Sequence, residues 1–151
     1  MLSDADRRIL RQFQAEPDAP QSALAERANV TPATLARRLA AMEQAGVIEG
    51  VGARINWVAL GYSVEVSLRI TLDKFEPRAF DAFLAEARRI PEVLELQTFV
   101  GSVDARVSLI ARDLAHYQEI YRARILTLPH ISDIEALMHV ARIKDAEDLP
   151  L

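Results

Sequence analysis

The sequence predicts an α+β protein that begins with a bundle of short helices and continues into an antiparallel sheet. Three observations support this prediction. Two short amphipathic helices flank a tight turn at Asn29, and the second half of the chain orders its elements as strand, helix, strand, strand, helix, strand. A third observation is residues 64–72, which alternate strictly between apolar and polar side chains, as a half-buried strand does.

Local signals in the first half place each helix. Apolar side chains recur at helical spacing over residues 3–14, behind Ser3 and Asp4, both good N-cap types. A second helix over residues 21–28 ends at Asn29, which tolerates a left-handed backbone. Thr31 as N-cap and Pro32 at the first helical position start a third helix, which Gly46 ends. The second and third helices with their turn form a helix-turn-helix.

A hairpin is expected directly after the third helix. Residues 47–57 are prone to β structure and contain Gly50 and Gly52. In this position a hairpin would be the wing of a winged helix-turn-helix. We therefore predict a helix-turn-helix domain over residues 1–50 and a wing and hinge linker over residues 51–62.

The remaining residues, 63–151, are predicted to form one domain. After the strand at residues 64–72 comes a helix that ends near Pro91, then strands at 93–100 and 105–111. A helix from Leu114 to Leu128 stops at Pro129, and a fourth strand runs from Ile134. This βαββαβ order is that of the ferredoxin-like fold, in which both helices cover one face of a four-stranded antiparallel sheet. The open face, to which we assign Leu137 and Ala141, would be buried against a second copy, so we expect a dimer.

Composition narrows the class of protein. Half of the 151 residues are apolar, which is enough for a core, and no run is long enough to span a membrane. The chain has no cysteine, which excludes disulfides, thiolate nucleophiles and cysteine-bound zinc. Asp4 and Asp6 occupy the place where a signal peptide would be basic. We expect a cytoplasmic protein without a membrane partner, a metal or a cofactor.

The net charge of −4 argues at first against a nucleic-acid partner. However, residues 1–60 carry seven arginines and seven acidic side chains, so the excess of acid lies in the second half. A neutral first half can still present a basic face to DNA.

Taken together, these segments resemble the Lrp/AsnC (feast/famine) family over essentially the whole chain. The segments that carry the resemblance are Leu2–Leu10, Leu24–Ala28, Val30–Pro32, Arg38–Leu39, Met42–Glu43, Gly46–Ile48, Gly101–Asp104 and Leu128–Pro129 followed by Ile131. The resemblance implies a transcription regulator that forms a homodimer, often assembled into a tetramer or octamer. It also implies an effector, typically an amino acid, bound at a cleft between C-terminal domains.

The start of the third helix is the predicted reader of double-stranded DNA. A helix-turn-helix lays this end in the major groove, where arginine can bind guanine and threonine or alanine can meet a thymine methyl group or a phosphate. The candidate residues are Thr31, Pro32, Ala33, Thr34, Arg37, Arg38 and, from the wing, Arg54. Arg37 and Arg38 could instead solubilise the helix, Arg38 could pair with Glu43 or Glu49, and Arg54 could be a solvated strand residue.

The segment Gly101–Asp104 resembles the effector loop of the family. Backbone amides in such a turn can cradle a carboxylate while Asp104 holds an ammonium, although a plain turn also favours glycine and aspartate. The full candidate set for the effector is Thr98, Gly101, Ser102, Val103, Asp104 and Glu135. Glu135 would be a second anchor for a cationic amine, or else an exposed strand carboxylate. Ser102 and Ala105 depart from the family pattern, as do Glu135 and Leu137, so the effector could be unusual or absent.

Two other functions remain open. Siroheme decarboxylases resemble the same architecture, and Val51–Ala53 is reminiscent of them, but Thr98, Phe99, Asp104 and Arg106 stand where those enzymes show His, Tyr and Trp. The histidines His116, His130 and His139 have no metal-ligand spacing, and the sequence offers no nucleophile, so we do not expect an enzyme. The neutral charge of residues 1–60 also leaves room for an interaction module that does not bind DNA.

Overall fold

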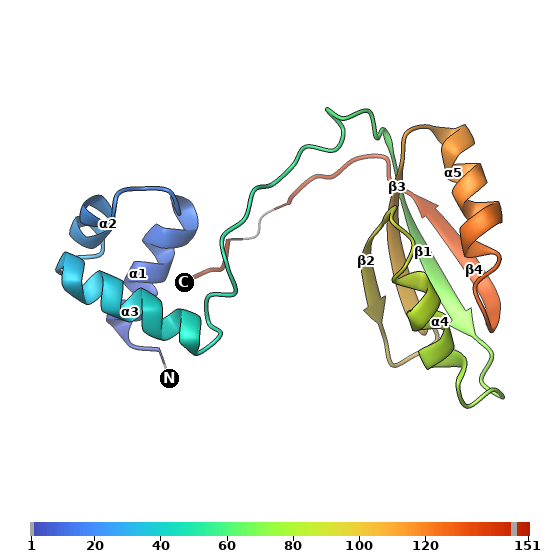
Figure 1. The fold of residues 1–151 in the computed structure, drawn as a ribbon, viewed down its shortest axis with the longest axis horizontal. Helices are drawn as coiled ribbons and strands as arrows, with labels where there is room; N and C mark the ends of the chain where they lie inside the picture. Colours follow the sequence, from blue (N-terminus) through green and yellow to red (C-terminus); the bar gives the residue numbers. More distant parts are fainter. Residues whose placement is uncertain (1, 146–147) are drawn as a thin grey trace. The chain divides into compact units, whose positions relative to one another are not determined.

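The computed structural model describes residues 2–145 and 148–151, which form two compact units (Figure 1). The first unit contains the residues up to Arg54 together with those from Lys144 onward, and the second is Ile55–Ile143. The sequence predicted ranges of 1–50, 51–62 and 63–151. The difference lies mainly in the C-terminal segment, which groups with the N-terminal helices.

The first unit consists of helices α1 (Asp4–Ala15), α2 (Gln21–Arg27) and α3 (Pro32–Gln44). Ser3 caps α1 in a capping box with Asp6, because the Ser3 hydroxyl accepts from the Asp6 amide while the Ser3 amide donates to the Asp6 carboxylate. The three helices share one apolar core, made of Ile9, Leu10, Leu24, Ala25, Ala28, Leu35, Leu39 and Met42. The predicted helix-turn-helix is confirmed.

A Schellman motif forms the turn between α2 and α3. Asn29 has a φ of 54°, its amide donates to Glu26, and the Val30 amide donates to the Ala25 carbonyl. Gly46 ends α3 with the same arrangement at a φ of 69°. Local hydrogen bonds thus set the ends of both α2 and α3.

The hairpin predicted over residues 47–57 is not formed. Residues 49–56 contain no strand, and Val51 and Ile55 are 60% and 65% exposed (Figure 1). A hairpin needs two strands that share a buried face, and these side chains have no apolar partner surface to cover. The β-prone composition of the segment therefore does not form a hairpin within this chain.

The C-terminal segment packs against α1, which the sequence analysis did not anticipate. Arg11 Nε donates to the Leu151 carbonyl over 2.9 Å, and the Gln14 side chain exchanges hydrogen bonds with the backbone of Leu149 at 2.8 and 3.1 Å. The Leu151 side chain packs against the core of the helices. These contacts explain why the segment belongs to the first unit.

The second unit is a four-stranded antiparallel sheet in the order β2-β3-β1-β4 (Figure 1). Its elements are β1 (Val64–Leu72), α4 (Ala79–Ala87), β2 (Val93–Thr98), β3 (Ala105–Ala111), α5 (Leu114–Ile120), the π-helix η1 (Tyr121–Ile125) and β4 (Ile131–Met138). Both helical segments pack on the same face of the sheet, since Phe83 of α4 and Ile120 of α5 belong to one core with Leu68 of β1. The predicted ferredoxin-like fold is confirmed.

The other face of the sheet is open in the single chain. It carries the alternate residues of each strand, among them Arg69, Arg106, Glu135 and Leu137. Leu137 lies on this face, opposite Ser67, as the sequence analysis predicted for the face. Ala141, which was assigned to the same face, lies beyond the end of β4.

The fourth strand begins at Ile131, three residues before the predicted start. A register shift occurs where β1 passes from Thr71 to Leu72, so that Leu72 lies opposite Ile131 and Thr71 opposite Asp133. Ile131 and Ile134 can then both pack on the core. This breaks the alternation of apolar and polar residues and hides the start of the strand from the sequence pattern.

Within the described residues, no helix is both long enough and apolar enough to cross a membrane.

Candidate DNA-binding helix and effector loop

The start of α3 presents the predicted DNA-reading residues on its outer surface. Leu35 and Leu39 face the core, so the helix turns Ala33 and Arg37 outward. Thr31, Pro32, Ala33 and Arg37 are exposed, and Thr34 is half-buried. In residues 2–145 and 148–151, the Arg37 side chain forms no hydrogen bond or ion pair. Its guanidinium is therefore available to a ligand.

Thr31 has a structural role at this helix start. Its hydroxyl accepts from the Thr34 amide at 3.2 Å and donates to the Thr34 hydroxyl at 2.8 Å. With Pro32 at the first position, this N-cap satisfies the end of the helix. Amides that remain at a helix start favour a phosphate.

Arg38 points the other way from Arg37 and binds α1. Its Nη1 donates to Asp6 Oδ1 at 2.8 Å and to the Ser3 hydroxyl at 3.1 Å. Hydrogen bonds from the Ser3 hydroxyl and amide, together with the Arg38 guanidinium, lower the pKa of Asp6 to about 2. The domain-supporting role considered for Arg38 thus has a partner, but it is Asp6 rather than Glu43 or Glu49.

Arg54 lies in the extended segment where the wing was expected. Its Nη2 is 2.9 Å from Asp145 Oδ2, and both side chains are largely in solvent. Since no wing is formed, a contact from Arg54 to a phosphate cannot come from a hairpin tip.

The loop between β2 and β3 holds most of the predicted effector residues. Gly101 has a φ of 157°, which L side chains rarely adopt, and open space where a Cβ would lie. Gly101 and Ser102 are exposed and Val103 is half-buried. The loop is anchored to β1, because the Asp104 amide donates to the Ile70 carbonyl and the Thr71 hydroxyl donates to the Ser102 carbonyl at 3.4 Å.

The Asp104 carboxylate is divided between two roles. Oδ2 accepts from the Leu72 amide at 2.8 Å and so continues the β1 ladder beyond its last backbone pair with β3. Oδ1 faces the ammonium of Lys74 at 3.9 Å. The carboxylate is 15% exposed whereas the Lys74 side chain is 63% exposed, so the lysine can move away. Oδ1 is thus a position that accepts an ammonium.

Thr98 lies at the base of this loop, whereas Glu135 lies on a different strand. Thr98 ends β2 opposite Ala105, in register with the core-facing row. Glu135 lies on the open face of β4, opposite Arg69, whose Nη1 is 3.3 Å from Glu135 Oε2. The predicted effector residues therefore gather at the loop and its base, except Glu135.

Comparisons with known proteins decide the family. The sequence pattern of the Lrp/AsnC ligand binding domain matches residues 65–149, and that of a winged helix-turn-helix DNA-binding domain matches residues 2–49. The chain belongs to the Lrp/AsnC family. It is a transcription regulator with an N-terminal DNA-binding domain and a C-terminal ligand-binding domain.

Relatives in this family extend over most of the chain. The proline dehydrogenase transcriptional activator of Rhodobacter capsulatus is 30% identical over 132 residues, which is 87% of this chain and 86% of that protein. The leucine-responsive regulatory protein of Rhizobium meliloti is 28% identical and covers 96% of this chain and 93% of its own length.

Solved structures of the family have the same fold. An AsnC family regulator from Agrobacterium tumefaciens has a TM-score of 0.89 at 26% identity, covering 99% of this chain and 97% of that chain. A transcriptional regulator from Neisseria meningitidis in complex with L-Met has a TM-score of 0.92 at 23% identity, with coverage of 99% and 97%. The second likeness concerns the fold alone.

Histidines do not build a site in the part of the chain that the structure describes. His116 Nδ1 accepts from the Arg112 amide at 3.1 Å, and His139 Nδ1 lies 3.5 Å from Glu65 Oε2. His130 occupies the turn before β4 at a φ of 63°. No group of three or more His, Cys, Asp or Glu among the described residues could hold a metal ion.

The sequence analysis missed two features of these sites. The pairing of Arg38 with Asp6 joins residues 32 positions apart, and no sequence signal identifies one acidic residue among several as the partner. Lys74 beside Asp104 was also missed. Two signals were available. Lys74 comes two residues after the end of β1, and β1 lies beside β3 in this fold.

Proposed function

We propose that this regulator reads double-stranded DNA with the N-terminal part of α3. The observation that carries the proposal is the contrast between two adjacent arginines. Arg38 is bound to Asp6, whereas Arg37 is exposed without a partner in the described chain. An arginine held out from a helix start can bind guanine O6 and N7 in the major groove or a backbone phosphate.

The surroundings of the other candidate DNA-binding residues suggest a different role for each group. Ala33 and Thr34 would meet base edges or a thymine methyl group, while Thr31 and Pro32 shape the helix start against the phosphates. Arg38 acts as a positioning residue that holds α3 on α1. Arg54 would contact a phosphate outside the major groove.

Selection of bound sequences from a random DNA pool tests this proposal. A dimer should enrich inverted half-sites whose centres lie about one helical turn, or a multiple of it, apart. The same selection with Arg37→Ala should lose enrichment. If the wild-type protein enriches no sequence, it does not read DNA, and the interaction module becomes the better account.

We propose further that an amino acid acts as the effector at the Gly101–Asp104 loop. Asp104 Oδ1 would accept the ammonium in place of Lys74, and backbone amides near Gly101 would receive the carboxylate. Relatives named for leucine and a fold neighbour solved with L-Met agree with this ligand class. Thr98, at the base of the loop, would line the same site, whereas Glu135 would join it from another copy of the chain or through a movement of the loop.

A thermal-shift screen against the twenty amino acids tests the effector proposal, because a ligand that binds only the native state raises its stability. A hit that the Asp104→Asn variant loses supports the loop site. Absence of any hit means that the loop is a plain turn and that regulation does not use a free amino acid.

The open sheet face is the proposed homodimer surface, with tetramers or octamers built from that dimer. Charged side chains on it are already paired, Glu95 with Arg106 at 3.1 Å and Arg69 with Glu135 at 3.3 Å. Pairing lowers the cost of covering them. Leu137 is 38% exposed and supplies apolar surface for the contact. Light scattering of the purified protein measures the state directly.

We also propose that the protein acts without catalysis, in the cytoplasm. The relatives described above are transcription regulators, and the chain has no cysteine. A siroheme decarboxylase would bind a tetrapyrrole and absorb visible light. A purified sample titrated with siroheme should show no bound chromophore, and a stable coloured complex would contradict the proposal.

A further inference from the structure

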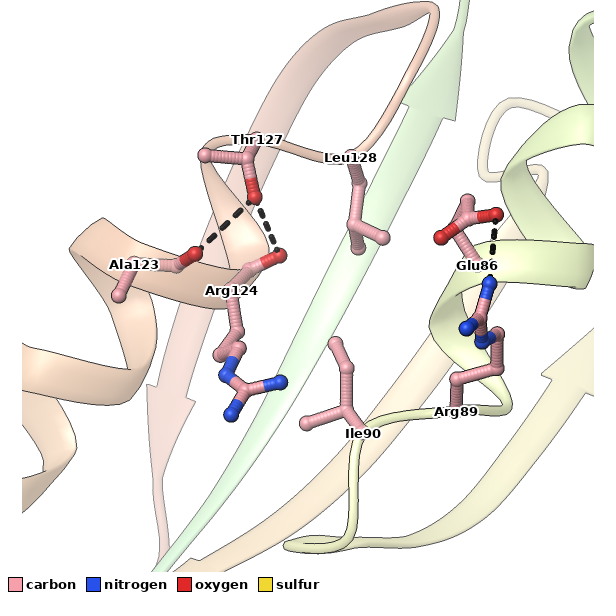
Figure 2. Close-up of a pocket in the computed structure, with 7 residues that line it drawn as sticks. All are labelled: Glu86, Arg89, Ile90, Ala123, Arg124, Thr127 and Leu128. Atoms are coloured by element: carbon pink, nitrogen blue, oxygen red, sulfur yellow. Dashed lines mark hydrogen bonds and ion pairs between the residues drawn. The ribbon is translucent and has the colours of Figure 1, made fainter.

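A cavity lies in the helical layer of the second unit, apart from the effector loop. It has a volume of 350 Å³ and is lined by Glu86, Arg89, Ile90, Ala123, Arg124, Thr127 and Leu128 (Figure 2). This volume is within the range of small-molecule sites, at its lower end. None of the lining residues belongs to the Gly101–Asp104 loop.

Two walls of the cavity carry arginines. Figure 2 shows Arg124 reaching inward from the η1 side and Arg89 on the opposite wall beside Glu86. Arg89 Nη1 lies 3.5 Å from Glu86 Oε1, and these side chains are 74% and 55% exposed, so this ion pair is weak. The Arg124 side chain forms no hydrogen bond or ion pair in residues 2–145 and 148–151.

Neighbouring arginines are used differently. Arg88 Nε donates to the Leu84 carbonyl at 3.1 Å, and Arg122 Nε donates to the Gln118 carbonyl at 3.4 Å. Both therefore bind the carbonyls of their own helices and neither lines the cavity. Of the four arginines, only Arg89 and Arg124 line this space.

The π-helix explains why Arg124 lies at the cavity. Ile120 and Ile125 are both buried, five residues apart, and the Leu126 amide donates to the Tyr121 carbonyl. In a regular α-helix, residue 124 would follow Ile120 on the buried face. The extra residue of the π-turn brings Ile125 to the core and leaves Arg124 exposed at its edge. Such turns frequently occur at functional sites.

The inner wall is apolar. Ile90 is 5% exposed and Leu128 is 9% exposed, so each belongs to the core of the domain and only a small part of its aliphatic side chain reaches the cavity. The Thr127 hydroxyl lies near Arg124 but donates to the Ala123 or Arg124 carbonyl, each at 3.1 Å, so it can only accept from a ligand. The cavity thus combines an unpaired guanidinium with an aliphatic wall.

We propose that this cavity binds a small organic carboxylate with an aliphatic side chain. The carboxylate would make a two-pronged contact with the Arg124 guanidinium, and the side chain would lie on Ile90 and Leu128. An α-amino acid and the corresponding 2-oxo acid both carry this carboxylate and side chain. Glu86 can release Arg89 and accept the ammonium of the amino acid. This site is independent of the effector loop.

Methyl-group NMR of the full-length protein tests the site. The probes are L-leucine, the 2-oxo acid of leucine, and isoamylamine, which keeps the side chain but lacks the carboxylate. At least one carboxylate should shift the methyl signals of Ile90 and Leu128, whereas isoamylamine should not. A stronger response to L-leucine assigns the site to amino acids, and a stronger response to the oxo acid assigns it to acids without the ammonium.

Matched variants make the test specific. Arg124→Gln should weaken binding at Ile90 and Leu128 at least about tenfold, because a charge-assisted contact is lost. Arg122→Gln removes the same charge from the same segment and should leave binding unchanged. Equal losses in both variants, equal binding of isoamylamine, or no shift with either carboxylate would overturn the proposal. L-leucine bound only at the effector loop would shift other signals, so failure of this site is distinct from failure of the loop.

Discussion

Arg38 Nη1 lies 2.8 Å from Asp6 Oδ1, and this ion pair joins α3 to the capping box at the start of α1. The two side chains are 32% and 13% exposed, so the contact is partly shielded from solvent. The residue that follows Arg37 on α3 therefore fixes that helix in its domain, and the two arginines should respond differently to mutation.

Arg38→Ala should lower the free energy of unfolding by about 1–2 kcal/mol, because a charge-assisted hydrogen bond is lost while Asp6 stays partly buried. Arg37→Ala is the matched control and should change it by less than about 0.5 kcal/mol. Urea denaturation followed by circular dichroism measures both. Equal stability of the two variants would mean that the ion pair contributes nothing.

The pKa of Asp6, lowered to about 2, predicts how stability depends on acid. A carboxyl group with a lowered folded-state pKa stabilises the protein above its unfolded-state value of 3.8, and this contribution is lost as pH falls toward 2. The stability difference between wild type and Asp6→Asn should thus be constant above about pH 5 and shrink between about pH 4 and pH 2. Denaturation curves at several pH values measure it, and a difference that does not depend on pH would contradict the assignment.

Arg37→Ala should reduce the salt dependence of DNA binding if Arg37 contacts a phosphate. The slope of log K against log salt concentration should become shallower by about 0.9. Fluorescence anisotropy with a selected operator measures it. A weaker affinity with an unchanged slope assigns Arg37 to a base, while unchanged affinity and slope remove it from the interface.

Asp104→Asn separates the two roles of that carboxylate. The amide oxygen can still accept from the Leu72 amide, so the fold should persist, but the attraction for an ammonium is lost. Thermal stabilisation by an amino acid bound at the loop should therefore disappear. Lys74→Ala should increase affinity for the amino acid, because a competing ammonium is removed. Asp133→Asn, an exposed carboxylate on β4, should have no effect.

Leu137→Asp tests the open sheet face as a dimer surface. A charge at the centre of a buried interface is unfavourable, so the variant should shift the dimer toward monomer in light scattering. Leu114→Asp is the control, since Leu114 is also an exposed leucine but begins α5 in the helical layer. If Leu137→Asp remains dimeric at the same protein concentration, another surface makes the dimer.

Local signals in the sequence determined the elements of both units. Ser3 and Thr31 cap their helices as predicted, because a hydroxyl at that position satisfies amides only three residues away. The alternation over residues 64–72 determined β1, since its apolar side chains must face one core. The order of these elements then permitted few topologies, which is why the fold could be predicted.

Only the tertiary structure decided how these elements were used. The partner of Arg38, the packing of Leu149 and Leu151 against α1, and the register shift that places Ile131 opposite Leu72 all join residues far apart in the chain. A hairpin was wrongly predicted over residues 47–57, because β-prone side chains form strands only where a surface is available to bury them.

The candidate sites show the same division. The sequence determined that α3 has an arginine-bearing start and that a glycine turn separates β2 from β3. It did not determine that Arg37 faces solvent while Arg38 faces α1, nor that Lys74 lies at Asp104, nor that a π-turn leaves Arg124 over an aliphatic cavity. The physical reason is that a residue's role depends on which distant groups surround it, and those groups are brought together only by packing.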